Sequence, residues 1–407
     1  YWGGASGLRM GLRNAAPSGS TPETTTFTRT LRLEQQTVYL GTAFVDKDED
    51  HWFYDDVFVY PGHTTDIGSY PFSAPGSANV PGVTVTGRVW GGQTEGLPDH
   101  WWMRLWLNGQ PFTSSGYAWS GYGPATIYTA SVTFPAAVVS TTNTITLEAS
   151  LAQVSGLSAY WINPDWFDVT YRALLHATAD RLDIQQALPG LQTFVAGGFS
   201  SPAVLAYDVS DPWHPVRLDG LVSSQQDTEF TQRFEAEGVH FLLSESAALL
   251  APQSLALVTT PDLRSASLGA DYLMIGPADF LAAAQPLLNV HSAEGLRVQT
   301  VDIQDIFDQF AGGHREPQAI RDFLTHAYFF WQRPAPTYVA LLGDGQYDFR
   351  NDTGRNLPNP VPPYLEPIDP YIIETVTDNA LVSVSGPGDI LPDMAIGRLP
   401  ANSVQEV

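Results

Sequence analysis

The sequence predicts a multi-domain protein of the β plus α/β class. Its 407 residues exceed the size of one ordinary domain and suggest two or three. Hydrophobic residues make up 43% and charged residues 15%, a balance that supports folded cores rather than disorder. Near residue 266 the spacing of apolar residues changes from alternation to a helical repeat. We therefore expect β-sheets first and an α/β domain after them.

On this pattern we divide the chain into four parts. An irregular segment, 1–24, precedes a β-sandwich, 25–172, and a small β-rich module, 173–265, and residues 266–407 form the first half of an α/β domain. Residues 399–407 read as the exit of a strand, an N-cap and the first turn of a helix. Because a domain rarely stops there, we expect this last domain to be truncated and the chain to be a fragment.

Short segments of alternating apolar and polar residues predict the β-sandwich. Met103, Leu105 and Leu107 fall on one face of a strand, and Asn108-Gly109 supplies a tight turn after it. No helical repeat interrupts these segments, which favours a jelly-roll-like sandwich. The module 173–265 is also strand-like, but its pattern is less regular.

Apolar strands alternating with amphipathic helices predict the α/β domain. The expected strands are 271–276, 297–301 and 337–342, and each is nearly continuous in apolar residues. Such strands are typical of a mainly parallel sheet covered on both faces. Because ligands gather at the carboxyl ends of these sheets, we expect any chemistry near Asp344 and Asp348, which follow the third strand.

The composition excludes several classes of partner and site. Lys and Arg number 19 against 43 Asp and Glu, and the net charge of −24 disfavours nucleic acid and anionic lipid surfaces. The chain has no cysteine, hence no disulfide, thiolate metal site or thiol nucleophile. No stretch approaches the roughly 20 apolar residues of a membrane-spanning helix. A low charged fraction and a single lysine, Lys47, indicate an extracellular or cell-surface protein.

Two acidic clusters are candidate cation sites. Asp344, Asp348 and Asp352 recur every four residues in a loop, where carboxylates can hold calcium or cap turns instead. The loop lacks the closing Glu of an EF-hand. A denser acidic run is predicted to be a solvated hairpin; it comprises Asp46, Asp48, Glu49, Asp50, Asp55 and Asp56.

Aromatic residues and histidines supply the other candidates. Tyr117, Trp119 and Tyr122 could form a platform that stacks sugars, although packing inside the sandwich is the favoured explanation. No serine-nucleophile elbow, zinc-binding helix or phosphate loop is present. The histidines of the helical region are interpreted as surface or packing residues: His291, His314 and His326.

Seven strings resemble the gingipain-type cysteine peptidases, a family with a caspase-like α/β fold. They occur in the family's order, as 270–275, 295–298, 304–310, 319–324, 338–345 with 347–348, 377–379 and 392–400. The last contains Ile-Gly-Arg-Leu-Pro. Upstream, 107–109, 166–171 and 207–212 are similar to regions that precede the peptidase domain in bacterial relatives.

The resemblance implies the amino-terminal part of a secreted cysteine endopeptidase that cleaves protein or peptide substrates. In the family a histidine base and a cysteine nucleophile follow the last string, and nothing here matches them. Asp378 is implied to orient that histidine or shape specificity, with a turn cap as the alternative. The rest of the polypeptide, or a second chain, is expected to complete the domain and cover a sheet edge near Arg398. The alternative function is a non-catalytic surface or assembly module, with carbohydrate binding by the sandwich.

Overall fold

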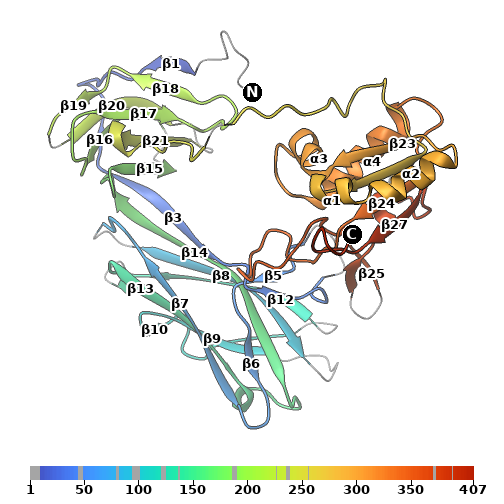
Figure 1. The fold of residues 1–407 in the computed structure, drawn as a ribbon. Helices are drawn as coiled ribbons and strands as arrows, with labels where there is room; N and C mark the ends of the chain where they lie inside the picture. Colours follow the sequence, from blue (N-terminus) through green and yellow to red (C-terminus); the bar gives the residue numbers. More distant parts are fainter. Residues whose placement is uncertain are drawn as a thin grey trace. The chain divides into compact units, whose positions relative to one another are not determined.

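The chain folds into two compact units in a computed structural model. The model describes residues 10–44, 49–78, 82–93, 101–120, 125–135, 138–185, 190–225, 227–234, 239–254, 256–369, 373–386 and 388–407. Unit 1 comprises Tyr1–Gln35 and Phe53–Leu255, and unit 2 comprises Gln36–Trp52 and Ala256–Val407. Figure 1 shows the fold, with labels on many of the elements of each unit.

Two antiparallel sheets form the β-sandwich of unit 1. One has the order β12 (Ala125–Phe134), β8 (Val83–Gln93), β14 (Tyr160–Leu174) and β3 (Thr26–Glu34), with β6 (Val57–Val59) on β14. The other has the order β10 (Gln110–Pro111), β9 (Trp101–Leu107), β13 (Thr142–Ser150) and β7 (Thr65–Ser73), with β11 (Tyr117–Trp119) on β9. Long strands that follow one another alternate between the sheets. This order is compatible with a jelly roll, which stays a prediction.

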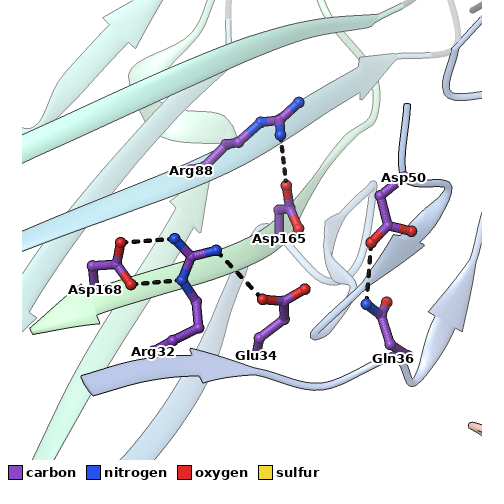
Figure 2. A network of polar contacts seen from close by, with 7 residues as sticks. All are labelled: Arg32, Glu34, Gln36, Asp50, Arg88, Asp165 and Asp168. Carbon is purple, nitrogen blue, oxygen red and sulfur yellow. Dashed lines mark hydrogen bonds and ion pairs between the residues drawn. The ribbon is translucent and has the colours of Figure 1, made fainter. Parts of the chain in front are cut away.

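Alternation along the strands builds the sandwich core. Met103, Leu105 and Leu107 of β9 are fully buried, as their spacing predicted. On the outer face, Arg32 of β3 lies opposite Asp168 of β14 and donates to both carboxylate oxygens at 2.6 and 2.8 Å. Figure 2 shows this pair with Glu34 beside it, and the ion pair between Arg88 and Asp165 at 3.3 Å.

Two smaller sheets complete unit 1. One has the order β1 (Gly11–Asn14), β18 (Val216–Asp219), β17 (Val204–Asp208), β21 (His240–Glu245) and β15 (Arg181–Gln185). The other has the order β19 (Val222–Ser223), β20 (Asp227–Phe234), β16 (Gly190–Gly197) and β2 (Glu23–Thr24). Three stacked or edge-on rings, Phe194, Phe230 and Phe241, fill their core. This core is continuous with that of the sandwich.

The segment 1–24, predicted to be irregular, contributes two strands to these sheets. β1 and β2 pair in parallel with β18 and β16, which lie about 200 residues later in the sequence. All four residues of β1 are exposed. Because backbone hydrogen bonds rather than a buried face hold β1, its sequence has no alternation that could have predicted it.

A four-stranded parallel sheet forms the centre of unit 2, as predicted. Its order is β23 (Val298–Asp302), β22 (Tyr272–Gly276), β24 (Tyr338–Leu342) and β27 (Ala395–Leu399). The helices, which Figure 1 shows in orange, are α1 (Ala278–Ala283), α2 (Gln285–Ala293), α3 (Ile303–Phe310) and α4 (Pro317–Phe330). α1 and α2 pack with one core cluster, and α3 and α4 with another. A hairpin of β25 (Leu365–Asp369) and β26 (Ile373–Val376) precedes β27.

Residues 36–52 belong to unit 2, although the sequence analysis placed them in the sandwich. We call their described residues, 36–44 and 49–52, the strap. β4 (Val38–Tyr39) pairs with β5 (Trp52–Phe53), and the Tyr39 ring stacks on Tyr347 with centroids 4.5 Å apart. The Glu374 amide of β26 donates to the Gly41 carbonyl at 3.0 Å. These partners lie about 300 residues away, so local periodicity could not reveal them.

Candidate functional site

The carboxyl ends of β24 and β27 are joined beyond the strands themselves. The Gly343 amide donates to the Leu399 carbonyl and the Asp344 amide to the Ala401 carbonyl, each at 2.9 Å. Gly343 has a φ of 144°, and a Cβ there would lie 2.8 Å from Pro360 Cβ. Glycine is therefore required where the chain leaves β24.

Arg398 and Asp378 form an ion pair at this edge of the sheet. Arg398, on β27, donates from Nε and Nη2 to the two carboxylate oxygens of Asp378 at 2.9 and 2.7 Å. Its Nη1 donates to the carbonyls of Gly343 and Val361 at 2.9 and 2.7 Å. One guanidinium therefore holds together β27, the end of β24 and two loops.

Asp378 was predicted either to orient a histidine or to cap a turn. It stands at the N-cap of a short 3-10 helix, Asn379–Leu381, but its side chain makes no capping hydrogen bond. Both oxygens instead face Arg398, and the two side chains are 20% and 14% exposed. Arg398 was not predicted as a site residue. The string Ile-Gly-Arg-Leu-Pro was the signal that could have identified it.

Two of the three aspartates proposed for calcium, Asp344 and Asp348, accept hydrogen bonds from neighbouring groups of the chain. Asp348 is 3% exposed and accepts from the amides of Asp352 and Thr353 at 2.6 and 3.0 Å, and from the Thr353 hydroxyl. Asp344 accepts from Gly345 and Asn402. Among the described residues, Asp344, Asp348 and Asp352 do not form a group with ligand atoms within 4.8 Å of one another. Asp348 thus fixes a turn, and the calcium site stays a prediction.

The acidic run is divided between the two units. Glu49 and Asp50 lie in the strap, where Asp50 accepts from Gln36 Nε2 at 3.1 Å (Figure 2). Asp55 and Asp56 lie in unit 1, where Asp55 is half-buried and Asp56 is exposed. The exposure of Asp56 agrees with a solvated run, and the hairpin stays a prediction. Asp46 and Asp48 lie outside the described residues.

The aromatic trio of the sandwich is partly buried. Trp119 is 8% exposed and stacks against Trp101 and Tyr128, with centroids 5.9 and 5.1 Å away. Tyr117 is half-buried and also contacts Tyr128. Tyr122 lies outside the described residues. The buried faces of Trp119 match the packing alternative, and sugar binding stays a prediction.

Histidines of unit 2 make local contacts. His291 Nδ1 lies 3.0 Å from Glu294 on the same helix, and the ring packs on Tyr272. His326 Nε2 lies 3.2 Å from the Arg264 carbonyl. His314 is exposed. None of the three lies among the hydrogen-bond partners of Asp378 that the structure describes.

The C-terminal part of unit 2 matches a known family. A comparison with protein-family models assigns residues 265–407 to peptidase family C25. These residues form a C25-type region. The match covers the parallel sheet, its helices and the Arg398–Asp378 pair, and it confirms the resemblance to gingipain-type peptidases.

Solved structures extend the likeness to the rest of the fold. The dimeric latent PorU from Porphyromonas gingivalis matches with a TM-score of 0.70 and 16% identity, covering 98% of this chain. The chain spans 38% of the length of PorU, so the C25-type region and the sheets before it share a fold with part of that protein.

Other comparisons add nothing to this picture. A structure described as a protease matches at 21% identity over 33% of this chain and 25% of its own, with a TM-score of 0.23. The isomalto-dextranase of Arthrobacter globiformis T6 complexed with panose matches at 12% sequence identity, with a TM-score of 0.22. The match covers 35% of this chain and 23% of the isomalto-dextranase chain. Both scores are too low to carry an argument. No curated protein matches the chain.

Proposed function

We propose that this chain is the amino-terminal part of a secreted, gingipain-like cysteine endopeptidase. The observation that carries the proposal is the C25-type parallel sheet, with β27 at its edge and a fixed carboxylate, Asp378, at the carboxyl ends of its strands. A peptidase of this type attacks a peptide carbonyl with a thiolate generated by a histidine base. Because the 407 residues contain no cysteine, the proposal assigns both groups to further polypeptide.

The edge strand β27 supports this completion. It pairs with β24 on one side, and Ala395, Gly397 and Leu399 are exposed. An unpaired strand edge is a template for another strand. In the proposal, the rest of the same polypeptide adds to β27 and brings the histidine and cysteine to the end of the sheet near Asp378. A second chain is the other candidate for this completion.

Asp378 suits the role of an orienting acid in this arrangement. Its carboxylate keeps lone pairs after accepting from Arg398, because an ionised carboxylate has about four acceptor positions. The bidentate contact fixes its direction, so it could accept an N–H from a histidine on the added strand. In the proposal, the residues that set substrate specificity also lie in the further polypeptide.

An extracellular location is part of the proposal. It rests on the acidic, lysine-poor composition and on the C25-type region. Among the described residues, no helix has the length and apolar character needed to span a membrane.

Proteolysis by the natural full-length polypeptide tests the proposal. We expect it to hydrolyse an unfolded protein substrate such as casein, and iodoacetamide to abolish that activity because it alkylates the thiolate. The 407-residue chain alone, as the control, is expected to be inactive. Activity that iodoacetamide leaves unchanged, or a full-length protein without activity, would contradict the proposal.

A further inference from the structure

A pocket of unit 2 lies between the strap, the loop after β24 and the hairpin β25–β26. Its volume is about 260 Å³, and residues from all three segments line it. We call it the strap pocket. Its lining includes aromatic, acidic and basic side chains: Tyr39, Glu49, Asp50, His51, Trp52, Tyr347, Arg350, Asp352 and Glu374.

One wall of the strap pocket is aromatic. Tyr39 and Tyr347 stack with an interplanar angle of 20°, and the Trp52 ring lies 5.2 Å from Tyr39 and 5.9 Å from Tyr347. The Tyr39 hydroxyl donates to Glu374, which fixes the ring and the carboxylate together. Aromatic faces of this kind attract cations and cover apolar stems.

The rest of the lining is rich in negative charge. Four carboxylates line the pocket, from Glu49, Asp50, Asp352 and Glu374. Burial raises the pKa of Asp352, and the charges of Asp348 and Asp50 raise it further, against an opposing effect of Arg350. Arg350 also lines the pocket and forms an ion pair with Glu316 at 3.7 Å. A positive charge in the pocket would relieve this repulsion between carboxylates.

The side chain of His51 has a ring nitrogen without a hydrogen-bond partner among the described residues. The ring is 4% exposed, and its Nδ1 lies 3.1 Å from the Leu40 carbonyl. A carbonyl only accepts, so Nδ1 carries a proton, and in the tautomer with that proton alone Nε2 is an acceptor. Within the described part of the chain, this buried Nε2 has no hydrogen-bond partner. Such atoms are costly to leave unpaired, which points to a donor supplied by a ligand.

A single metal ion does not fit this set of acceptors. Among the described residues, the carboxylates and His51 of the pocket do not form a group whose ligand atoms lie within 4.8 Å of one another. An anion does not fit either, because the four carboxylates of the lining would repel it. The acceptors are instead spread over a cavity large enough for an organic group.

We propose that the strap pocket binds an organic cation, an ammonium or guanidinium group on an apolar stem. The stem packs against the rings of Tyr39 and Trp52, and the charged head lies among Asp352 and Glu374, with one N–H for His51 Nε2. A basic side chain of a peptide and a free polyamine share this chemistry. The inference does not depend on the catalytic role proposed above.

Calorimetric titration of the 407-residue chain tests the site and distinguishes the two sources. The probes are N-acetyl-arginine methylamide, spermidine and the neutral analogue N-acetyl-citrulline methylamide. We expect saturable binding of a cation and at least about tenfold weaker binding of the citrulline compound. Tighter binding of the arginine compound identifies a peptide side chain as the ligand, and tighter binding of spermidine identifies a polyamine. Equal binding of the citrulline compound, or no saturable binding of either cation, would overturn the proposal.

Substitutions locate the binding. Glu374→Gln keeps an acceptor for Tyr39 but removes the charge, and we expect about tenfold weaker cation binding. His51→Phe keeps a buried ring but removes Nε2, with a loss of several-fold. Glu294→Gln removes an exposed carboxylate at the C-cap of α2; it is the matched control and should leave affinity unchanged. Near-ultraviolet circular dichroism checks folding; if Glu374→Gln is unfolded, Asp352→Asn replaces it. Unchanged affinity in a folded charge variant contradicts the site.

Discussion

At the scale of single residues, the ion pair between Arg398 and Asp378 is the most informative contact of the C25-type region. The guanidinium makes four hydrogen bonds, two to the carboxylate and two to carbonyls. Both side chains are largely buried, so removal of one charge leaves the other without compensation. The same pair therefore stabilises the sheet edge and directs the carboxylate of Asp378.

Arg398→Met is expected to lower the free energy of unfolding of the chain by about 3 kcal/mol, because Asp378 and two carbonyls lose their donor. Urea unfolding measures this change. Arg32→Met is the matched control, since Arg32 also binds a carboxylate through two nitrogens but its side chain is 47% exposed. We expect a loss below about 1 kcal/mol there. Equal losses in the two variants would show that the Arg398 pair has no special structural role.

The pH dependence of stability tests a second ion pair, at the amino end of the sheet. Arg297 donates to both oxygens of Asp271 at 2.7 to 3.0 Å, and these hydrogen bonds lower the pKa of Asp271. A carboxyl whose pKa is lower in the folded state than in the unfolded state stabilises the protein at pH values above its unfolded-state pKa. This stabilisation is lost as the pH falls through the folded-state pKa. Wild type should therefore exceed Asp271→Asn in stability at pH 7.

The difference between wild type and Asp271→Asn should shrink as pH falls below about 4, the ordinary pKa of an aspartate. Urea unfolding between pH 7 and pH 2.5 measures it. In an Arg297→Met background this difference should change less with pH, because only the backbone amide of residue 297 still donates to Asp271. If the difference in stability between wild type and Asp271→Asn does not change with pH, the hydrogen bonds from Arg297 are not the cause of the lowered pKa of Asp271.

At the scale of elements, the sequence predicted those with a buried face. The strands of the parallel sheet are nearly continuous in apolar residues, and α4 begins at Pro317 with one apolar stripe, so both were readable. β1, with four exposed residues, and the strap, whose partners are Tyr347 and Glu374, were not. Their positions depend on contacts between distant segments, which periodicity does not report.

The same distinction applies to the candidate site residues. Asp344 was expected at the carboxyl ends of the strands from its position after the third strand, and Asp378 was implied only by the family resemblance. Their partners could not be predicted, because Arg398 and Asn402 reach them across loops of about 20 and 60 residues. His51 was not predicted as a site residue, because the lack of a partner for its Nε2 among the described residues is visible only in three dimensions.

Substitutions in strand β11, which contains Tyr117 and Trp119, test the sugar-binding prediction. Trp119 lies between the rings of Trp101 and Tyr128, so Trp119→Ala should leave a cavity and cost about 3 to 5 kcal/mol in unfolding free energy. Tyr117→Ala, at a half-buried position on the same strand, should cost less. Glycan retention by the folded variants gives the second measurement. Loss of retention in Tyr117→Ala with stability preserved would favour sugar binding over packing.

At the scale of the whole molecule, the fold class was predicted correctly, but the boundaries between the two compact units could not all be predicted from the sequence. The β-rich module shares one core with the sandwich, and unit 2 begins at Ala256 and includes Gln36–Trp52. Leu263, in the stretch assigned to the module, is 2% exposed in the core of unit 2. Where the sequence on both sides of a boundary is strand-like, the spacing of apolar residues does not change there, so the sequence does not mark the boundary.

The central claim is that the C25-type region is one half of a peptidase domain. Denaturing intact-mass spectrometry of the natural protein, after treatment with iodoacetamide, tests it most directly. The account predicts a polypeptide heavier than these 407 residues, or a co-purifying second chain, that gains the mass of an alkylated thiol. A species with the mass of the 407 residues alone, without any alkylated companion, would contradict the claim and leave the non-catalytic module as the function.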